Sequence, residues 1–318
     1  MDEMKKLGLA VFGTGFWGRN HVRILNSLKN AKVVSICDTD LKRARQVGTR
    51  YEVEYCCDID EILAREDVEA ATICTPTTTH KDVAAKLIRA GKDVLIEKPL
   101  ASTSREAREL LSLAKKNRVR VGVGFVERYN PAVRYVKRLI DKKELGKIIL
   151  VIAHRVTRWP VRIGDVGVTK DSAIHDIDTM RYLMESDVKT VYARTGRLAH
   201  KHEDFSEILL NFSDGEVGFI DANWLTPRKI RKLTVTGSEA TATIDYVTQE
   251  TVVENSNRSI MPKIRWEEPL KLELESFVKA ILAGRQPSAS GEDGLKALEV
   301  CEAALESGAT GQVVQIGS

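Results

Sequence analysis

The sequence predicts an α/β protein with two domains, a doubly wound parallel sheet followed by a domain with a mostly antiparallel, open sheet. Short apolar runs alternate with segments of helical length from residue 7 to about residue 122, which is typical of a parallel sheet with crossover helices. Beyond that point several strand-like runs follow one another through short turns such as Ser213-Asp214-Gly215, which favours antiparallel pairing. We expect a first domain at residues 1–122 and a second at residues 123–318.

The first strand leads into a glycine-rich turn. The apolar run at residues 7–12 is followed by Gly13-Thr14-Gly15-Phe16-Trp17-Gly18 and a helix-like segment at residues 19–28. This order is that of the strand, turn and helix of a dinucleotide-binding Rossmann domain. Gly13 would allow a sharp turn, Gly15 a close approach of the backbone to a pyrophosphate, and Gly18 close packing of the helix on the strand. The helix N-terminus would face the phosphates.

The second strand, at residues 32–37, ends in an acidic residue. Asp38 follows Gly18 by 20 residues, where the fold places a carboxylate on the adenosine ribose. A carboxylate there repels a 2′-phosphate, so NAD is favoured over NADP. Lys42 and Arg43 lie close by in the sequence, which leaves NADP open.

The alternation continues to the end of the first domain. We expect helices at residues 41–50, 80–90 and 103–117 and strands at residues 69–74, 93–96 and 118–123, with Thr77, Thr78 and Thr79 capping the second helix. Ligands of such sheets bind beyond the C-terminal ends of the strands. Because Gly13, Asp38, Thr75 and Lys98 all lie at such ends, we expect one crevice to hold them.

The sequence of the second domain predicts a sheet with a few helices. Helices are expected at residues 131–140, 172–184, 270–283 and 292–305, and strands at residues 147–156, 190–198, 206–212, 216–224, 230–237, 241–246 and 250–254. An open sheet needs a cover for its far face. We therefore expect a homodimer or homotetramer formed through that face.

The composition limits the classes of partner. The chain has 318 residues, 43% of them hydrophobic and 30% charged, and a net charge of +4, which favours a small-molecule substrate over nucleic acid. Its five cysteines show no metal-binding spacing, so we expect reduced thiols and no metal. Since the sequence shows neither a signal peptide nor an apolar run of membrane-spanning length, we expect a cytoplasmic protein without a membrane partner.

The densest cluster of titratable groups spans residues 171–178. Asp171 and His175 are four residues apart, which places them on one face at a helix start. Carboxylates rather than further histidines surround them, so a catalytic pair is favoured over a zinc site. The alternative is a helix-capping Asp171 with a buried, hydrogen-bonded His175.

Along its whole length the chain resembles the glucose-fructose oxidoreductase, inositol dehydrogenase and MocA family. The resemblance lies in the glycine-rich turn, in Cys74-Thr75-Pro76-Thr77, in Glu97-Lys98-Pro99-Leu100 and in the D-x-x-x-H spacing of Asp171 and His175. It implies an NAD-dependent oxidoreductase with catalytic residues Lys98, Asp171 and His175. The strand ends and the resemblance together give the expected cofactor-binding residues: Gly13, Gly15, Phe16, Trp17, Gly18, Asp38, Thr75, Pro76, Glu97 and Lys98.

Alcohol oxidation explains these residue types. The hydroxyl proton needs a base, and a histidine with an ordinary pKa of about 6.5 suits this role near neutral pH. Asp171 would orient the substrate or the imidazole, and Lys98 would hold the developing alkoxide. Lys98 would be the base instead if burial lowered its pKa from about 10.4 towards 7–8. We favour His175, and the sequence leaves both open.

The substrate expectation rests on a second resemblance. The run Arg162-Ile163-Gly164-Asp165-Val166-Gly167-Val168, continuing into Asp171 and His175, looks like the branch that oxidises the 3-hydroxyl of UDP-N-acetylglucosamine or its uronic acid.

Basic and polar residues near these segments are candidate substrate contacts. Guanidinium groups suit a diphosphate, although a charged surface strand would also explain the arginines. The expected substrate contacts are Lys98, Arg128, Asn130, Arg155, Arg158, Arg162, Asp171 and His175. The alternatives are a dehydrogenase of a free polyol such as an inositol, and a non-catalytic NAD-binding sensor.

Overall fold

The structure is a computed structural model that describes residues 5–159 and 165–317. The chain forms two compact units. The first combines the residues up to Phe125 with Leu270–Leu295, and the second combines Val126–Pro269 with the residues from Lys296 on. Residues 270–295, expected in the second domain, pack instead on the end of the parallel sheet. The backbone N–H of Val123 donates to the carbonyl of Ala289 at 3.0 Å, and Gly122 bridges to Ser290.

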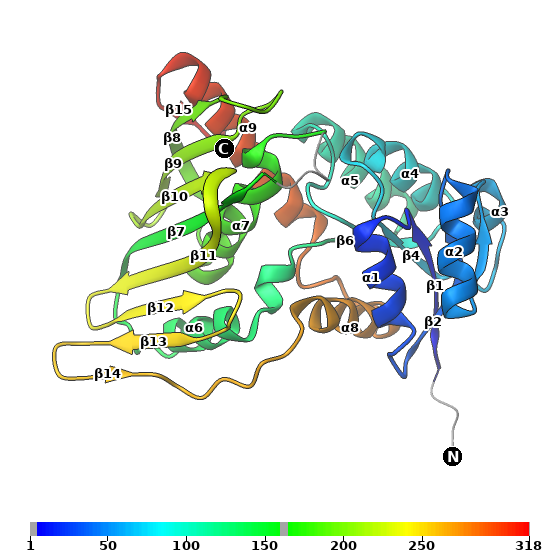
Figure 1. Ribbon diagram of the computed structural model, residues 1–318, viewed down its shortest axis with the longest axis horizontal. Helices are drawn as coiled ribbons and strands as arrows, with labels where there is room; N and C mark the ends of the chain where they lie inside the picture. Colours follow the sequence, from blue (N-terminus) through cyan, green and yellow to red (C-terminus); the bar gives the residue numbers. More distant parts are fainter. Residues whose placement is uncertain (1–4, 160–164, 318) are drawn as a thin grey trace. The chain divides into compact units, whose positions relative to one another are not determined.

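The first unit is the predicted Rossmann domain (Figure 1). Six strands pair in the order β3-β2-β1-β4-β5-β6, and every pair is parallel. The strands are β1 (Leu7–Phe12), β2 (Ala31–Cys37), β3 (Glu54–Cys56), β4 (Ala70–Ile73), β5 (Asp93–Ile96) and β6 (Val121–Val123). The helices are α1 (Phe16–Leu25), α2 (Leu41–Tyr51), α3 (Asp60–Leu63), α4 (Thr77–Arg89), α5 (Ser104–Asn117) and α8 (Pro269–Leu282). The doubly wound parallel sheet is confirmed.

Sequence composition accounts for the strands and helix starts of this unit. Every residue of β1, β4 and β5 is buried, as expected for strands covered on both faces. Asp40 and Thr103 cap α2 and α5 by accepting from the backbone N–H groups of Arg43 and Glu106. The expectation for α4 was wrong, because the helix begins at Thr77. All three threonines therefore lie inside it, and Pro76 occupies the capping position without a side-chain bond.

The second unit contains the predicted, mostly antiparallel sheet. Among the described residues, nine strands pair in the order β14-β13-β12-β11-β7-β10-β9-β8-β15, and of these pairs only β7 and β10 run parallel. They are β7 (Ile148–Arg158), β8 (Val188–Gly196), β9 (Phe205–Phe212), β10 (Val217–Asn223), β11 (Leu225–Gly237), β12 (Thr241–Asp245), β13 (Thr251–Glu254), β14 (Ser259–Ile260) and β15 (Val314–Gln315). The helical segments are a 3-10 turn at Val126–Tyr129, α6 (Pro131–Asp141), a π-helical turn at Thr169–Ala173, α7 (Ile174–Met184) and α9 (Gly291–Thr310).

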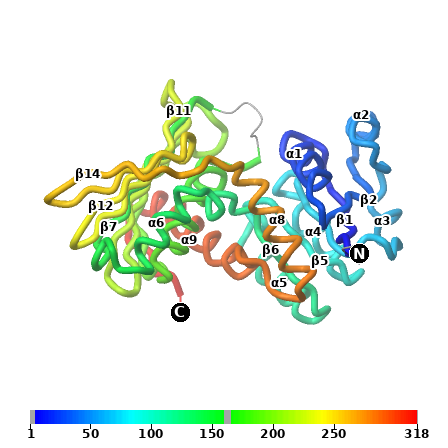
Figure 2. The backbone as a smooth tube through the Cα atoms, turned by 90° about the horizontal axis from the view of Figure 1, so that it is seen from below, coloured from blue at the N-terminus to red at the C-terminus, as the bar shows by residue number. Residues whose placement is uncertain are grey.

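Helices cover one face of this sheet (Figure 2). A side chain at Gly218 of β10 would meet the sulfur of Met180 in α7, and Ser307 of α9 accepts from the backbone N–H of Ala193 in β8. The opposite face carries Ile152 and Phe219, which are 38% and 37% exposed. This open face is the one the sequence predicts. In the described residues, every helix is too short or too polar to span a bilayer.

Candidate active site

The glycine-rich turn has a distinct environment at each glycine. Gly13 has a φ of +80°, and a Cβ there would lie 2.8 Å from the carbonyl carbon and oxygen of Cys74. A Cβ at Gly18 would lie 1.7 Å from the carbonyl oxygen of Gly13. Around Gly15, the described residues leave the position of a Cβ open to 4 Å. Gly13 and Gly18 therefore let the turn and α1 close on the strands, and Gly15 leaves room for a pyrophosphate at the N-terminus of α1.

Asp38 lies buried at the end of β2 beside this turn. Its Oδ2 accepts from the backbone N–H and the hydroxyl of Thr14 at 2.7 and 2.8 Å. Burial raises the pKa of Asp38, but hydrogen bonds from Asp40 and Thr14 and the charge of Arg43 outweigh it, so this pKa lies below its usual value. The carboxylate is thus ionised, and Arg43 is engaged by Asp38 and Asp40 at 3.5 and 3.2 Å. This arrangement fits the ribose of NAD and disfavours a 2′-phosphate.

The next two strand ends are joined by a histidine that the sequence analysis passed over. His80 of α4 is 1% exposed, and its two ring nitrogens lie 2.9 Å from the carbonyl oxygen of Thr75 and 2.8 Å from that of Pro99. A carbonyl oxygen only accepts, so the ring nitrogen of His80 that carries the proton is the donor. The half-buried Lys98 precedes Pro99 through a cis peptide bond. His80 therefore ties the backbone that follows β4 to the backbone that follows β5 and carries Lys98.

Glu97 has a structural partner. The buried His21 of α1 lies with its Nε2 3.1 Å from Oε1 of Glu97, which ties the helix of the glycine turn to the end of β5. Phe16 and Trp17 begin α1, and Phe16 is 56% exposed. The structure thus brings the predicted cofactor residues to one edge of the parallel sheet.

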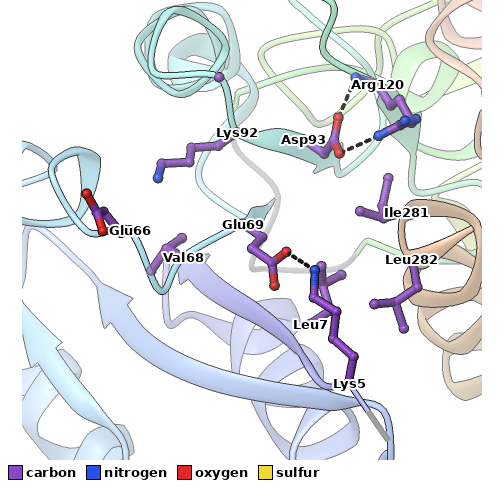
Figure 3. Close-up of a pocket in the computed structure, with 11 residues that line it drawn as sticks. Lys5, Leu7, Glu66, Val68, Glu69, Lys92, Asp93, Arg120, Ile281 and Leu282 are labelled. Carbon is purple, nitrogen blue, oxygen red and sulfur yellow. Dashed lines mark hydrogen bonds and ion pairs between the residues drawn. The ribbon is translucent and has the colours of Figure 1, made fainter. Parts of the chain in front are cut away.

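A cavity of about 350 Å³ lies at the opposite, amino-terminal edge of this sheet (Figure 3). Figure 3 shows two pairs among its charged side chains: Lys5 contacts Glu69 at 2.7 Å, and Arg120 contacts Asp93 at 2.9 Å. Ligands of parallel sheets bind at the other edge, so this cavity is not the cofactor site.

In the second unit, Asp171 and His175 lie on consecutive helical segments. Asp171 belongs to the π-helical turn, and His175 lies in the first turn of α7. A regular α-helix from residue 172 was expected; the structure instead has a π-helical turn, a feature frequent at functional sites. Both side chains are half-buried.

A hydrogen-bond relay reaches Asp171 from the sheet. The indole Nε1 of the buried Trp224 donates to Oγ of Ser172 at 3.2 Å, and Ser172 donates to Oδ2 of Asp171 at 3.1 Å. An indole only donates, so the Ser172 hydroxyl must direct its own proton to Asp171. His200 packs edge-on against Trp224 with ring centroids 5.2 Å apart. Sequence reasoning missed this relay because Trp224 lies 52 residues from Ser172.

Arg155 lies in the core of the second unit. It is 4% exposed, and its guanidinium donates to Oδ1 of Asp176 at 3.0 Å and to Oε1 of Glu127 at 3.1 Å. Burial alone would lower the pKa of Arg155, but the two carboxylates hold it above its usual range. The hydroxyl of Tyr246 also donates to Asp176, at 3.1 Å. Asp176 directly follows His175 in α7, so the network fixes α7 to β7 beside His175.

The remaining candidate contacts divide by burial. Arg128 is 6% exposed and donates twice to Asp178, at 2.7 and 2.6 Å, and Asn130 is fully buried as the cap of α6. Arg158, the last residue of β7, is exposed. Arg162 lies outside the described residues.

Comparison with known proteins agrees with this arrangement. Residues 7–125 match a family model described as an oxidoreductase family with an NAD-binding Rossmann fold, so the chain is an NAD-binding oxidoreductase. Residues 133–243 match the GFO/IDH/MocA C-terminal domain. The chain belongs to the GFO/IDH/MocA family, whose members oxidise sugar and polyol hydroxyls.

Individual relatives span nearly the whole chain. The scyllo-inositol 2-dehydrogenase (NAD(+)) of Bacillus subtilis is 30% identical over 328 residues, covering 96% of this chain and 95% of the relative. The solved structure of GenD2 from gentamicin A biosynthesis, in complex with NAD, is 26% identical with a TM-score of 0.88 and covers 100% of this chain and 98% of its own. The UDP-N-acetylglucosamine 3-dehydrogenase GnnA from Acidithiobacillus ferrooxidans shares the fold, with 24% identity, a TM-score of 0.89 and coverage of 97% and 100%.

Proposed function

We propose that this protein oxidises the 3-hydroxyl of a UDP-linked N-acetylated amino sugar, UDP-N-acetylglucosamine or its uronic acid, with NAD. The observation that carries the proposal is Arg158, an exposed guanidinium at the end of β7 upstream of Asp171 and His175. Arg155 and Arg128 are both buried against carboxylates, whereas Arg158 is in contact with solvent. An exposed guanidinium suits a diphosphate, which a free polyol lacks.

The proposed chemistry uses three side chains. His175 takes the proton of the sugar hydroxyl, since an imidazole is a suitable base near neutral pH. Asp171, aimed by the Ser172 hydroxyl, orients the substrate or the imidazole. Lys98 stabilises the developing alkoxide by its charge. NAD, when bound, accepts the hydride that leaves the sugar carbon.

The site residues also separate an enzyme from a sensor. A sensor requires the glycine turn and Asp38 but has no need of a base and a cation for the hydroxyl proton. Lys98→Ala and His175→Ala should each lower kcat by about 10²-fold or more while NAD still binds. Unchanged turnover in both variants would contradict the catalytic assignment.

A second candidate is the oxidation of a free polyol. It is favoured by the names of relatives, several of which are inositol 2-dehydrogenases at 27–30% identity. A free polyol has no diphosphate for Arg158 to bind. The two candidate functions therefore differ in whether the substrate must carry a diphosphate.

A substrate panel tests the proposal. UDP-N-acetylglucosamine, its uronic acid, UDP-glucose, free N-acetylglucosamine, myo-inositol and scyllo-inositol would each be offered with NAD, and the absorbance of reduced nicotinamide would be followed. We expect turnover with the UDP-linked amino sugars and little with the free sugars. Efficient turnover of an inositol with none of the UDP-sugars would overturn the proposal.

A further inference from the structure

Two basic residues of β11 lie beside the buried network of Arg155 and have no role in the chemistry proposed above. Arg231 pairs in register with Arg155 across β11 and β7 (Figure 1). Residues directly opposite each other in an antiparallel pair project from the same face, so Arg231 lies on the face where Arg155 meets Asp176 of α7. The fully buried Leu233 continues this face, and Lys229 precedes Arg231 on it, because side chains alternate along a strand.

The backbone of Arg231 is tied to the segment that contains His175. Its carbonyl oxygen accepts from the backbone N–H of Tyr246 at 2.9 Å. The hydroxyl of Tyr246 donates to Asp176, which follows His175 in α7. The residues that hold α7 beside β7 therefore also set the position of Arg231.

Arg231 has a guanidinium without a hydrogen-bonded carboxylate. Its Nη1 lies 3.8 Å from Oε1 of Glu127, beyond hydrogen-bond distance, and Arg155 already donates to that oxygen at 3.1 Å. Within residues 5–159 and 165–317, this is the one ion pair of Arg231, and Lys229 forms none. The buried Arg155 and Arg128, in contrast, each hold a carboxylate with two nitrogens.

The two cations lie close to each other and within electrostatic reach of Asp171. The charge of Arg231, ahead of burial, lowers the pKa of Lys229. Burial, followed by the charge of Arg155, lowers the pKa of Arg231, whereas nearby carboxylates, Asp171 among them, raise it. A guanidinium stays charged at neutral pH even so. The two cations therefore carry more positive charge than their one carboxylate contact balances, and an anion bound between them would relieve it.

Both cations are accessible to a ligand. The side chain of Arg231 is 36% exposed, and Lys229 is exposed as well. A guanidinium binds a carboxylate with two parallel hydrogen bonds, and an ammonium adds a point charge. This pair of side chains therefore suits a carboxylate that one face of the substrate presents.

The diphosphate of the proposed substrate has a different candidate partner. Arg158 lies three residues beyond Arg155 on β7, so its backbone is roughly 10 Å along the strand from the position opposite Arg231. Two separate cationic positions fit a substrate with two separate anions. The uronic acid of UDP-N-acetylglucosamine has both a diphosphate and a 6-carboxylate.

We propose that Arg231 and Lys229 form a carboxylate subsite near Asp171 that binds the 6-carboxylate of the sugar, which makes the uronic acid the preferred substrate. The assignment rests on the proposed UDP-sugar oxidation and selects between its two substrates. Arg231 holds the carboxylate through two N–H groups, and Lys229 balances its charge. UDP-N-acetylglucosamine has a neutral hydroxymethyl group at this position and leaves both cations without an anion.

Kinetics with the two substrates test the subsite. kcat and KM would be measured with NAD for the uronic acid and for UDP-N-acetylglucosamine, on the wild type, Arg231→Met, Arg231→Lys and Lys229→Met. We expect the wild type to prefer the uronic acid by about tenfold or more in kcat/KM. In Arg231→Met, KM for the uronic acid should rise about tenfold or more, and KM for UDP-N-acetylglucosamine should stay within about threefold.

The other variants grade the effect and control for folding. Arg231→Lys keeps the charge without the planar fork, so it should lose less than Arg231→Met. Lys229→Met should shift KM for the uronic acid by about threefold. Arg258→Met removes an exposed guanidinium from the turn between β13 and β14 and should leave both KM values unchanged. Circular dichroism should show every variant folded.

The outcomes separate the subsite from the proposed function. A wild type that uses UDP-N-acetylglucosamine at least as well as the uronic acid would overturn the carboxylate subsite and leave the UDP-sugar oxidation standing. Equal losses on both substrates in Arg231→Met would do the same, and would assign Arg231 to the diphosphate or to folding. A wild type that oxidises neither UDP-sugar would overturn both the subsite and the proposed function.

Discussion

At the scale of single residues, two arginines of one strand have different surroundings. Arg155 is held by Asp176 and Glu127 in the core, and Arg158 ends the same strand in solvent. Removing Arg155 would leave two carboxylates buried without a cation, so Arg155→Met should lower the free energy of unfolding by about 3–5 kcal/mol. Arg158→Met should leave stability within about 0.5 kcal/mol and raise KM for the UDP-sugar about tenfold.

Thermal unfolding and steady-state kinetics of the two variants provide the measurement. A stable Arg155→Met protein with a raised KM would instead assign Arg155 to the substrate. An Arg158→Met protein with unchanged kinetics would remove the observation on which the UDP-sugar proposal stands.

The relay from Trp224 through Ser172 to Asp171 gives a second prediction at this scale. Trp224→Phe keeps an aromatic ring in place but removes the donor that orients Ser172. We expect Trp224→Phe and Ser172→Ala each to lower kcat about tenfold, with NAD affinity unchanged. Because both substitutions break the same hydrogen-bond relay, the double variant should be no slower than the slower single variant. Additive losses would show that the two residues act separately.

At the scale of elements, the glycine turn separates folding from cofactor binding. Gly18→Ala would drive a Cβ into the carbonyl oxygen of Gly13, so it should cost about 3 kcal/mol of stability. Gly15→Ala places its Cβ in open space, so the melting temperature should hardly change. The same Cβ would obstruct the pyrophosphate, and Kd for NAD should rise by about tenfold or more. Calorimetric titration with NAD would check this, and tight binding by Gly15→Ala would contradict it.

The connection between β8 and β9 depends on one carboxylate. Asp204 is 1% exposed, and its Oδ2 accepts from the backbone N–H groups of Leu198, Ala199 and His200. Burial raises the pKa of Asp204, but these hydrogen bonds outweigh it and lower that pKa below its ordinary value of 3.8. The stabilisation is therefore present above that value and is lost as the pH falls through the lowered folded-state pKa.

Asp204→Asn tests this connection. Near pH ~7 the variant should lose about 2 kcal/mol of stability relative to the wild type, and the difference should shrink in strong acid. Denaturant unfolding at both pH values would measure it. A difference that stays constant with pH would exclude the ionised carboxylate as its cause.

Most of the helices and strands could be predicted from the sequence. The apolar strands and the glycine turn are local patterns, and β1 and β5 have the predicted bounds. The short β3 and the two-residue β14 and β15 were missed, because so few residues show no periodicity. The π-helical turn was missed because its residues also suit an α-helix.

The residues of the candidate site could be predicted where a single stretch of sequence contains the whole motif. Gly13, Asp38 and Lys98 follow strands that the sequence shows, and Asp171 and His175 share one segment. The burial of Arg155 depends on Glu127 and Asp176, which are 28 and 21 residues away. The roles of His80 and Trp224 likewise depend on carbonyl and hydroxyl groups brought close only by folding.

At the scale of the whole molecule, the division of the chain is not contiguous. Residues from Leu270 to Leu295 complete the unit that holds the glycine turn, although they follow the nine-stranded sheet in the sequence. The apolar pattern of α8 predicts a buried face but not which sheet it packs on. Proteins cut after residue 269 should therefore lose stability in the NAD-binding unit.

In the proposed reaction, NAD takes a hydride from C3 of a UDP-linked amino sugar. The most direct measurement offers the enzyme UDP-N-acetylglucosamine that carries deuterium at C3 only, and follows the label by mass spectrometry. We predict that the deuterium appears in the reduced nicotinamide and that the remaining UDP-sugar becomes a 3-keto product without the label. Reduced nicotinamide free of deuterium, or no reduction of NAD at all, would contradict the proposed reaction.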